Sequence, residues 1–195
     1  MAKRRVYEEN AVITKTAELF ARYGYRNITM QFLAEELGIA KPTLYVYGRS
    51  KQSLLDTVNI RFLEQVEIGL KLAQAEKGAG NQLRKVMHLW IELYAREWPS
   101  IRVYHAEIKE VSGPTREAIR VRSAKIVAAL TTMVKKAQAD GEIDPDLPPR
   151  FVVWTILGAI NWMPRWYRSE SWTPLQIGDF LTNMVFMKRA ASSGR

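Results

Sequence analysis

The pattern of apolar and polar positions predicts α-helices along the whole chain. In residues 10–23, apolar side chains recur every three or four positions, and the run stops at Gly24, a residue suited to the left-handed end of a helix. A short second helix is expected over residues 29–37 and a third over residues 41–47. Pro42 is compatible with the third helix because the first helical turn needs no backbone N–H at that position.

The rest of the chain predicts longer helices. A fourth helix begins after Ser50 and runs to the glycine-containing break at residues 77–80. Further apolar stripes follow at residues 83–94, 119–134, 149–168 and 174–189. Trp98-Pro99 and Ser112-Gly113-Pro114 are interpreted as breakers between them. With no strand pattern and no internal repeat, the predicted fold class is all-α.

The change from short to long helices divides the chain within the fourth helix. Residues 1–61 form one predicted domain, with three short helices, and residues 62–195 form another, with five or six longer ones. We therefore expect a small module joined by a long helix to a helical bundle.

Composition narrows the class of protein. A chain of 195 residues that is 47% hydrophobic and 25% charged is typical of soluble globular proteins. The absence of cysteine excludes disulfides, thiolate catalysis and sulfur-based zinc sites. The longest nearly apolar run, residues 151–164, is shorter than the roughly 20 residues of a membrane span, and no secretory signal is evident, so a cytoplasmic location is expected. The net charge of +9 fits a polyanionic partner.

Residues 29–47 have the form of a helix-turn-helix, two short helices joined by a glycine-containing turn. On the second of these helices Leu44 is expected to point into the core. Its outer face is expected to present Lys41, Thr43, Tyr45 and Tyr47, which can hydrogen-bond base edges and phosphates. Residues 48–51 then bring two positive charges to the start of the fourth helix, where free backbone N–H groups favour a phosphate.

The stretch from Thr14 to Leu55 closely resembles the amino-terminal domain of TetR-family transcriptional regulators. The resemblance is carried by residues 16–25, Thr29, Leu33-Ala34, Leu37-Gly38-Ile39, Pro42-Thr43-Leu44-Tyr45, Ser50-Lys51 and Leu54-Leu55. It implies a helix-turn-helix module on a ligand-binding and dimerisation domain, and a homodimer bound to a palindromic double-stranded DNA operator. It also implies a set of DNA-binding residues within the motif Thr29 to Gly48 and just beyond it: Thr29, Gln31, Lys41, Pro42, Thr43, Tyr45, Tyr47 and Lys51.

The chain departs from the family pattern near the recognition helix. Ala40 stands where many members have a serine-type cap, so the helix start is expected to lean on Pro42. Tyr47 stands where many members have histidine, so its hydroxyl would supply the phosphate contact. The basic run Lys3-Arg4-Arg5 is either a DNA-binding arm or a solvated tail.

All six tryptophans lie in the carboxy-terminal half. Most aromatics at helical spacing are core residues, but a bundle that encloses a small apolar ligand needs such walls and a few polar groups. Asn161 and Arg165 are four residues apart on one helix face, as are Trp162 and Trp166. They are expected to form a buried or half-buried cradle for an anionic aromatic or nucleotide-like group. The candidate ligand-binding residues are Trp90, Tyr94, Trp154, Asn161, Trp162, Arg165 and Trp166.

Residues 154–168 resemble the end of the ligand domain in TetR-type regulators of lipid and steroid breakdown that respond to acyl-coenzyme A thioesters. This resemblance implies an acyl-CoA effector, with Arg165 and Trp166 near its coenzyme A part. Arg116, Arg120 and Arg122 are further candidates for its phosphates. The other interpretation of residues 161–167 is a dimer interface, because the last two helices form one in this family, and a third is that the segment serves both roles.

Other classes of function are less well supported. The only histidines, His88 and His105, have neither metal-binding nor catalytic spacing, so neither an enzyme nor a cofactor is expected. A basic peripheral membrane protein is an alternative, but short loops between apolar stripes are typical of a bundle, and no membrane partner is expected. A TetR-type regulator of efflux or other metabolism that responds to a hydrophobic non-CoA compound stays open. The operator, the regulated genes and the sign of regulation are not fixed by the sequence.

Overall fold

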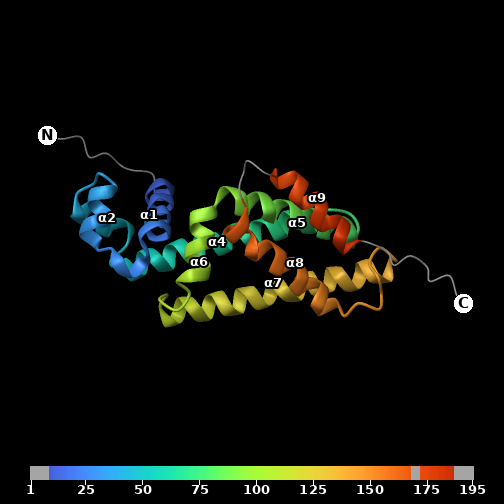
Figure 1. The fold of residues 1–195 in the computed structure, drawn as a ribbon. Helices are drawn as coiled ribbons and strands as arrows, with labels where there is room; N and C mark the ends of the chain where they lie inside the picture. Colours follow the sequence, from blue (N-terminus) through green and yellow to red (C-terminus); the bar gives the residue numbers. More distant parts are fainter. Residues whose placement is uncertain (1–8, 168–171, 187–195) are drawn as a thin grey trace, which may run out of the picture. The chain divides into compact units, whose positions relative to one another are not determined.

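The computed structural model describes residues 9–167 and 172–186, all in helices and their connections (Figure 1). The basic run Lys3-Arg4-Arg5 lies outside the described residues. In order, the elements are α1 (Glu9–Tyr23), the 3-10 turn η1 (Tyr25–Asn27), α2 (Met30–Glu36), α3 (Lys41–Tyr47), α4 (Lys51–Gln74), α5 (Ala79–Arg96), α6 (Trp98–Ala106), α7 (Gly113–Ala139), α8 (Pro149–Trp166) and α9 (Pro174–Val185). The predicted all-α fold class is confirmed.

The chain divides into two compact units. The first consists of Met1–Glu64 and Glu97–Arg120, and the second of Gln65–Arg96 and Val121–Arg195. Two of the three boundaries, after residues 64 and 120, fall inside the long helices α4 and α7, and the third lies between α5 and α6. Residues 97–120, which the sequence analysis assigns to the ligand domain, pack within the first unit.

The core of the first unit is built from the apolar faces of α1 to α4 and α6. Phe20, Leu33 and Leu44 are almost completely buried, and Val103 of α6 joins the same cluster. The turns around α2 use Gly24 and Gly38, whose positive φ angles of 82° and 65° are readily adopted only by glycine. The short α2 and α3 are therefore held by tertiary packing, since helices of seven residues are not stable alone.

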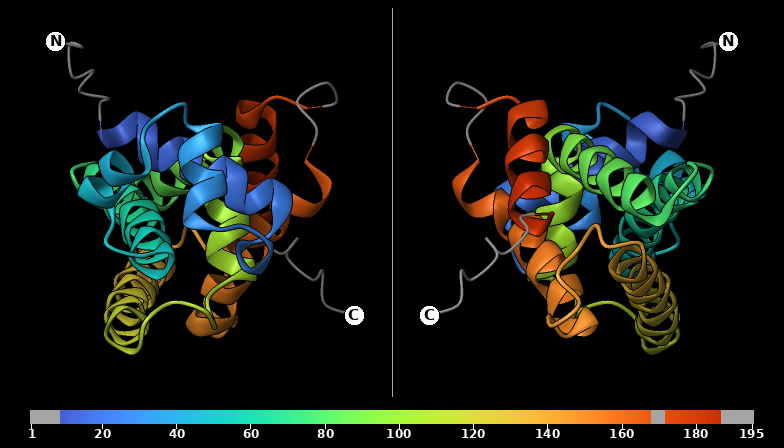
Figure 2. Two further views of the ribbon diagram at one scale, coloured as in Figure 1. Left: turned by 90° about the vertical axis from the view of Figure 1, so that its left-hand side faces the viewer. Right: turned by 90° about the vertical axis from the view of Figure 1, so that its right-hand side faces the viewer.

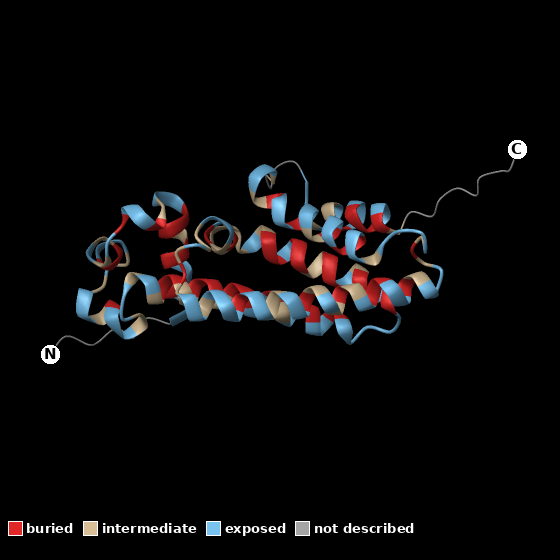
Figure 3. Ribbon diagram, turned by 90° about the horizontal axis from the view of Figure 1, so that it is seen from below, coloured by how far each residue is buried: buried red, intermediate tan, exposed pale blue. Residues whose placement is uncertain are grey.

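The core of the second unit centres on α5, which packs against α8 and α9 (Figure 2). Buried positions recur along one side of the helices while the opposite side stays exposed (Figure 3). Two glycines let helices approach closely: a Cβ on Gly69 would lie 3.0 Å from the Trp90 indole, and one on Gly178 would lie 2.3 Å from the His88 ring. His88 Nε2 also lies 3.4 Å from an Asp179 carboxylate oxygen, so a polar contact joins α5 and α9 beside this close approach.

Two sequence interpretations need correction. Trp98-Pro99 is not a simple breaker, because it begins α6; proline is tolerated in the first turn, where its missing N–H has no partner to lose. The two last helices end earlier than expected, α8 at Trp166 and α9 at Val185. Within the described ranges no helix is long and apolar enough to cross a membrane.

Candidate functional site

The outer face of α3 is exposed and bears polar side chains. Leu44 is the one fully buried side chain of this helix, as the sequence predicts. The structure exposes Lys41, Pro42, Tyr45 and Val46, and half-buries Thr43 and Tyr47. Tyr47 packs against the core of the unit, so only part of its ring lies at the surface. Val46 was missed by the sequence analysis, which looked for polar residues on this face.

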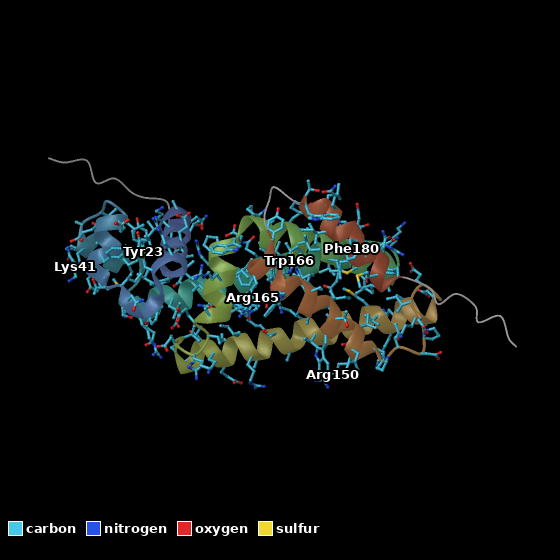
Figure 4. All side chains as sticks on the ribbon, in the orientation of Figure 1. Tyr23, Lys41, Arg150, Arg165, Trp166 and Phe180 are labelled. Carbon is cyan, nitrogen blue, oxygen red and sulfur yellow. The ribbon has the colours of Figure 1, made fainter. Side chains whose placement is uncertain are left out.

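The start of α3 has no side-chain cap. Ala40 occupies the N-cap position in an extended conformation, and Pro42 lies in the first turn, as expected. Proline has no N–H to satisfy there and its fixed φ suits a helix, which offsets part of the missing cap. Lys41 and Pro42 are both exposed beside this start, and Figure 4 shows Lys41 at the surface.

The start of α2 is capped by the first residue of the motif. The Thr29 hydroxyl oxygen accepts a hydrogen bond from the Phe32 backbone N–H at 3.1 Å. A hydroxyl that accepts in this way still carries its own hydrogen to donate. One turn into the helix, the Gln31 side-chain amide donates to the Glu35 carboxylate at 2.7 Å, on the exposed side.

Lys51 is directed into the first unit. Its ammonium donates to the backbone carbonyls of Tyr25 and Ile28, both at 2.8 Å, and lies 4.4 Å from the centre of the Tyr25 ring. Burial, together with the nearby carboxylates Glu110, Asp56 and Glu107, raises the pKa of the Tyr25 hydroxyl, so the ring under the ammonium stays neutral. The resemblance assigns Lys51 a phosphate contact, but in the free protein this lysine joins the start of α4 to the turn before α2.

The connection between α6 and α7 holds the same turn from another side. The Glu107 carboxylate accepts from the Tyr25 backbone N–H at 3.3 Å, and Arg26 pairs with Glu110. The Asp56 carboxylate of α4 accepts from the Ser112 backbone N–H at 2.9 Å. The helix-turn-helix is therefore anchored by residues 107–112 as well as by its own core.

Two of the ligand candidates are core residues of the second unit. Trp90 is 2% exposed, and its indole N–H donates to the Val66 carbonyl at 2.9 Å. Tyr94 is also buried, and its hydroxyl donates to the Asn161 side-chain oxygen at 2.6 Å. This bond joins α5 to α8.

The remaining ligand candidates lie on an exposed stripe of α8. Trp162 is 56% exposed, and Trp154, Arg165 and Trp166 are exposed on the same stripe (Figure 4). The Arg165 guanidinium lies 4.2 Å from the centre of the Trp162 ring, a stacked cation–π contact. The expectation that these residues form a buried or half-buried cradle is wrong for the single protomer, because they are exposed. The buried side of α8 is the opposite one, which carries Val153, Ile156 and Ile160.

The exposed stripe continues onto α9. Phe180 is 62% exposed, and Trp166, Trp172, Ile177 and Phe180 line an apolar pocket of about 210 Å³. Halfway along α8 the stripe is interrupted by the exposed Gly158. We define the α8/α9 face by its exposed large apolar residues: Phe151, Trp154, Trp162, Trp166, Leu175, Phe180 and Met184.

The three arginines considered as phosphate ligands already have partners. Arg116 donates to the carbonyls of Lys109 and Val111, at 2.7 and 3.1 Å. Arg120 forms a bidentate pair with Glu117. Arg122 pairs with Glu67 at 2.6 and 2.7 Å, and these bonds lower the pKa of the Glu67 carboxyl. Arg116 ties α7 to the connection before it and Arg122 ties α7 to Glu67 of α4, whereas the Arg120–Glu117 pair lies within α7.

Comparison with known proteins gives two family matches. The family described as "Bacterial regulatory proteins, tetR family" matches residues 12–58, which include α2, α3 and the start of α4. The family described as "Tetracyclin repressor-like, C-terminal domain" matches residues 76–187.

Individual relatives agree with these matches. The transcriptional regulator MftR of Mycobacterium tuberculosis is 25% identical over 187 residues, 88% of this chain and 85% of the relative. The repressor KstR2 of Mycolicibacterium smegmatis is 25% identical, over 78% of this chain and 75% of the relative. The crystal structure of AibR with isovaleryl coenzyme A and operator DNA has a TM-score of 0.82 at 26% identity and covers 91% of this chain and 97% of that one.

Proposed function

We propose a mechanism for this chain, which belongs to the TetR family of bacterial regulatory proteins and is a DNA-binding transcriptional regulator, not an enzyme. In this mechanism the chain acts in the cytoplasm as a homodimeric repressor. Each protomer inserts α3 into the major groove of one half-site of a palindromic operator. A small apolar or acyl ligand, for which an acyl-CoA thioester is the leading candidate, then releases the DNA.

The observation that carries the proposal is the position of α3 within the matched helix-turn-helix. Its core side is filled by Leu44, and its outer side is exposed and bears Lys41 and Tyr45. Residues 1–61 have ten lysine and arginine residues against six acidic ones, a net charge of +4. Contacts from these cations to phosphates make binding steeply salt-dependent, while Thr43 and Tyr45 contribute contacts to base edges.

Tyr45→Ala tests the assignment of α3 as the recognition helix. Because Tyr45 is 43% exposed and lies outside the core cluster, we expect an unchanged thermal melting curve. Loss of its base or phosphate contacts is expected to weaken operator binding at least about 30-fold, since one good contact contributes about 1–3 kcal/mol in each of two half-sites, or at least about 2 kcal/mol in total. Fluorescence anisotropy with a labelled duplex measures the change, and Tyr23→Ala, at an exposed tyrosine outside α3, is the matched control. Equal affinities for wild type and Tyr45→Ala would remove Tyr45 from the interface.

The α8/α9 face supports a dimer between two copies of the chain. Seven large apolar side chains are exposed on two neighbouring helices, and Trp166 and Phe180 of this set line one apolar pocket; large exposed apolar patches mark interaction sites. A two-fold arrangement would bury the same face of each copy against the other. Such a dimer presents two copies of α3 to successive half-sites and accounts for a palindromic operator.

The effector proposal rests on charged, aromatic and polar side chains of the second unit. Arg165, stacked on Trp162, provides a cation and an indole for a phosphorylated, aromatic ligand such as coenzyme A. The hydrogen bond between the buried Tyr94 and the exposed Asn161 provides further polar groups where α5 meets α8. The crystal structure of AibR, which is 26% identical over most of the chain, is of a complex with isovaleryl coenzyme A and operator DNA. This neighbour supports an acyl-CoA thioester as the class of effector. The ligand acts by binding more tightly to a form of the dimer that does not fit the operator.

Arg165→Ala tests the effector site. Operator binding without effector is expected to be unchanged, because Arg165 lies outside the helix-turn-helix and is not one of the apolar residues that define the α8/α9 face; sedimentation checks that the variant keeps the mass of the wild type. The acyl-CoA concentration needed to release DNA is expected to rise at least tenfold, since a hydrogen-bonded charge contact contributes about 1.5–3 kcal/mol. Arg150→Ala is the matched control, because Arg150 also stacks on a tryptophan of α8, at 5.0 Å from the Trp154 ring. Full release at the wild-type concentration would exclude Arg165 from the effector site.

A further inference from the structure

The recognition helix carries an exposed aliphatic side chain at its most accessible position. Val46 is 67% exposed, the largest exposed fraction among the large hydrophobic residues that the structure describes. Val46 does not belong to the core cluster of the first unit. Leu44 is part of that cluster, and Tyr47 packs against it. The isopropyl group therefore stays mostly exposed in the free protomer.

Helical geometry places Val46 at the centre of the outward face of α3. Residues two apart on a helix point to nearly opposite sides, and Val46 is two residues from the buried Leu44. Residues four apart share a side, and the exposed Pro42 lies four residues before Val46. Thr43 and Tyr47 are half-buried at the margins of this face, so Val46 reaches furthest from the core.

The surroundings of Val46 favour a nucleic acid over an apolar protein surface. Lys41 and Arg49 are exposed at the two ends of α3, and Tyr45 is exposed beside Val46. An apolar protein partner would be expected to meet several aliphatic residues together, as on the α8/α9 face, not one valine among cations. In the major groove, thymine is the base that presents a methyl group, while the other base edges present only hydrogen-bonding groups.

We propose that Val46 is a specificity-determining residue that packs against the C5 methyl group of a thymine in each operator half-site. The inference rests on the proposed function, because it requires α3 to lie in the major groove. Burying one methyl contributes about 0.8 kcal/mol, or about fourfold in affinity, and a dimer makes the contact twice. Loss of both contacts is therefore expected to weaken binding about 15-fold.

The test uses operators in which deoxyuridine replaces thymine, since uracil lacks the methyl group and keeps the same hydrogen-bonding edges. A bound duplex is first selected from a random pool with the full-length protein. Each thymine is then replaced, one symmetric pair at a time, and affinity is measured by anisotropy for wild type and Val46→Ala. We expect one pair whose replacement weakens wild-type binding about 15-fold, and a Val46→Ala protein that is insensitive to the same replacement.

Control variants and the possible outcomes separate a contact of Val46 with thymine from a general loss of DNA binding. Val121→Ala, at an exposed valine of α7, is expected to keep the wild-type response, and thermal melting checks that Val46→Ala is folded. If no thymine pair matters, or if Val46→Ala retains the full sensitivity, the inference is overturned while the regulator function stands. If the wild-type protein selects no duplex at all, the proposed function fails, and the inference fails with it.

Discussion

Gly158→Arg is expected to convert the proposed dimer into a folded monomer. Gly158 is exposed midway along the α8/α9 face, and a Cβ added there meets none of the described atoms within 4 Å. Arginine is also a better helix former than glycine, so the protomer is expected to keep its stability. In the dimer, however, a long charged side chain would be forced between two apolar helices, where an unpaired charge is costly.

The consequence for DNA binding is large. A dimer holds two recognition helices on one operator, and linking two binding modules raises affinity by a factor of about 10² to 10⁴ over one module. Gly158→Arg is therefore expected to weaken operator binding at least 100-fold, with a halved mass by sedimentation. Gly158→Ala is the matched control and is expected to remain dimeric. A Gly158→Arg protein that sediments as a dimer would show that the α8/α9 face is not the interface.

Lys51→Ala is expected to destabilise the first unit and to weaken DNA binding indirectly. The ammonium makes two hydrogen bonds to backbone carbonyls, and bonds to charged groups contribute about 1.5–3 kcal/mol each. With partial compensation by water at this half-buried site, we expect the free energy of unfolding to fall by about 2–3 kcal/mol. Because the turn before α2 loses its anchor, operator affinity is also expected to fall.

The salt dependence of binding separates this positioning role from a phosphate contact. Removing a lysine that contacts phosphate reduces the slope of log K against log salt by about 0.9 for each contact. Lys51→Ala is expected to keep the wild-type slope, whereas Lys41→Ala, at an exposed lysine of α3, is expected to reduce it and leave the melting curve unchanged. A reduced slope with normal stability in Lys51→Ala would instead assign Lys51 to the DNA backbone.

The helix-turn-helix could be predicted in detail because its signals are local. Glycines mark the turns, Thr29 caps α2, and Leu44 alone has the spacing that buries it. The role of Lys51 is not local: its carbonyl partners lie 23 and 26 residues earlier in the chain, and sequence spacing does not reveal that they meet. Val46 could have been predicted, since its two-residue separation from Leu44 already indicates an outward position. It was missed because polar side chains were sought on this face of α3.

The carboxy-terminal half was harder to predict because α8 is apolar on more than one side. Val153, Ile156 and Ile160 are buried, yet Trp154, Trp162 and Trp166 on the same helix are exposed. Helical spacing identifies both stripes, but it does not say which stripe packs inside the protomer. Likewise, Trp98-Pro99 indicates an interruption but not whether one helix ends there or another begins. In the structure it begins α6.

The most direct test of ligand-controlled DNA binding is an effector titration on the protein–operator complex. Fluorescence anisotropy of a selected operator duplex is measured with the dimer while a panel of acyl-CoA thioesters and the matching free acids is added. The account predicts that the wild-type protein binds the duplex and that at least one thioester releases it at concentrations where its free acid does not. Binding that every thioester leaves undisturbed would contradict the acyl-CoA effector, and release by a hydrophobic compound without coenzyme A would establish the alternative ligand class.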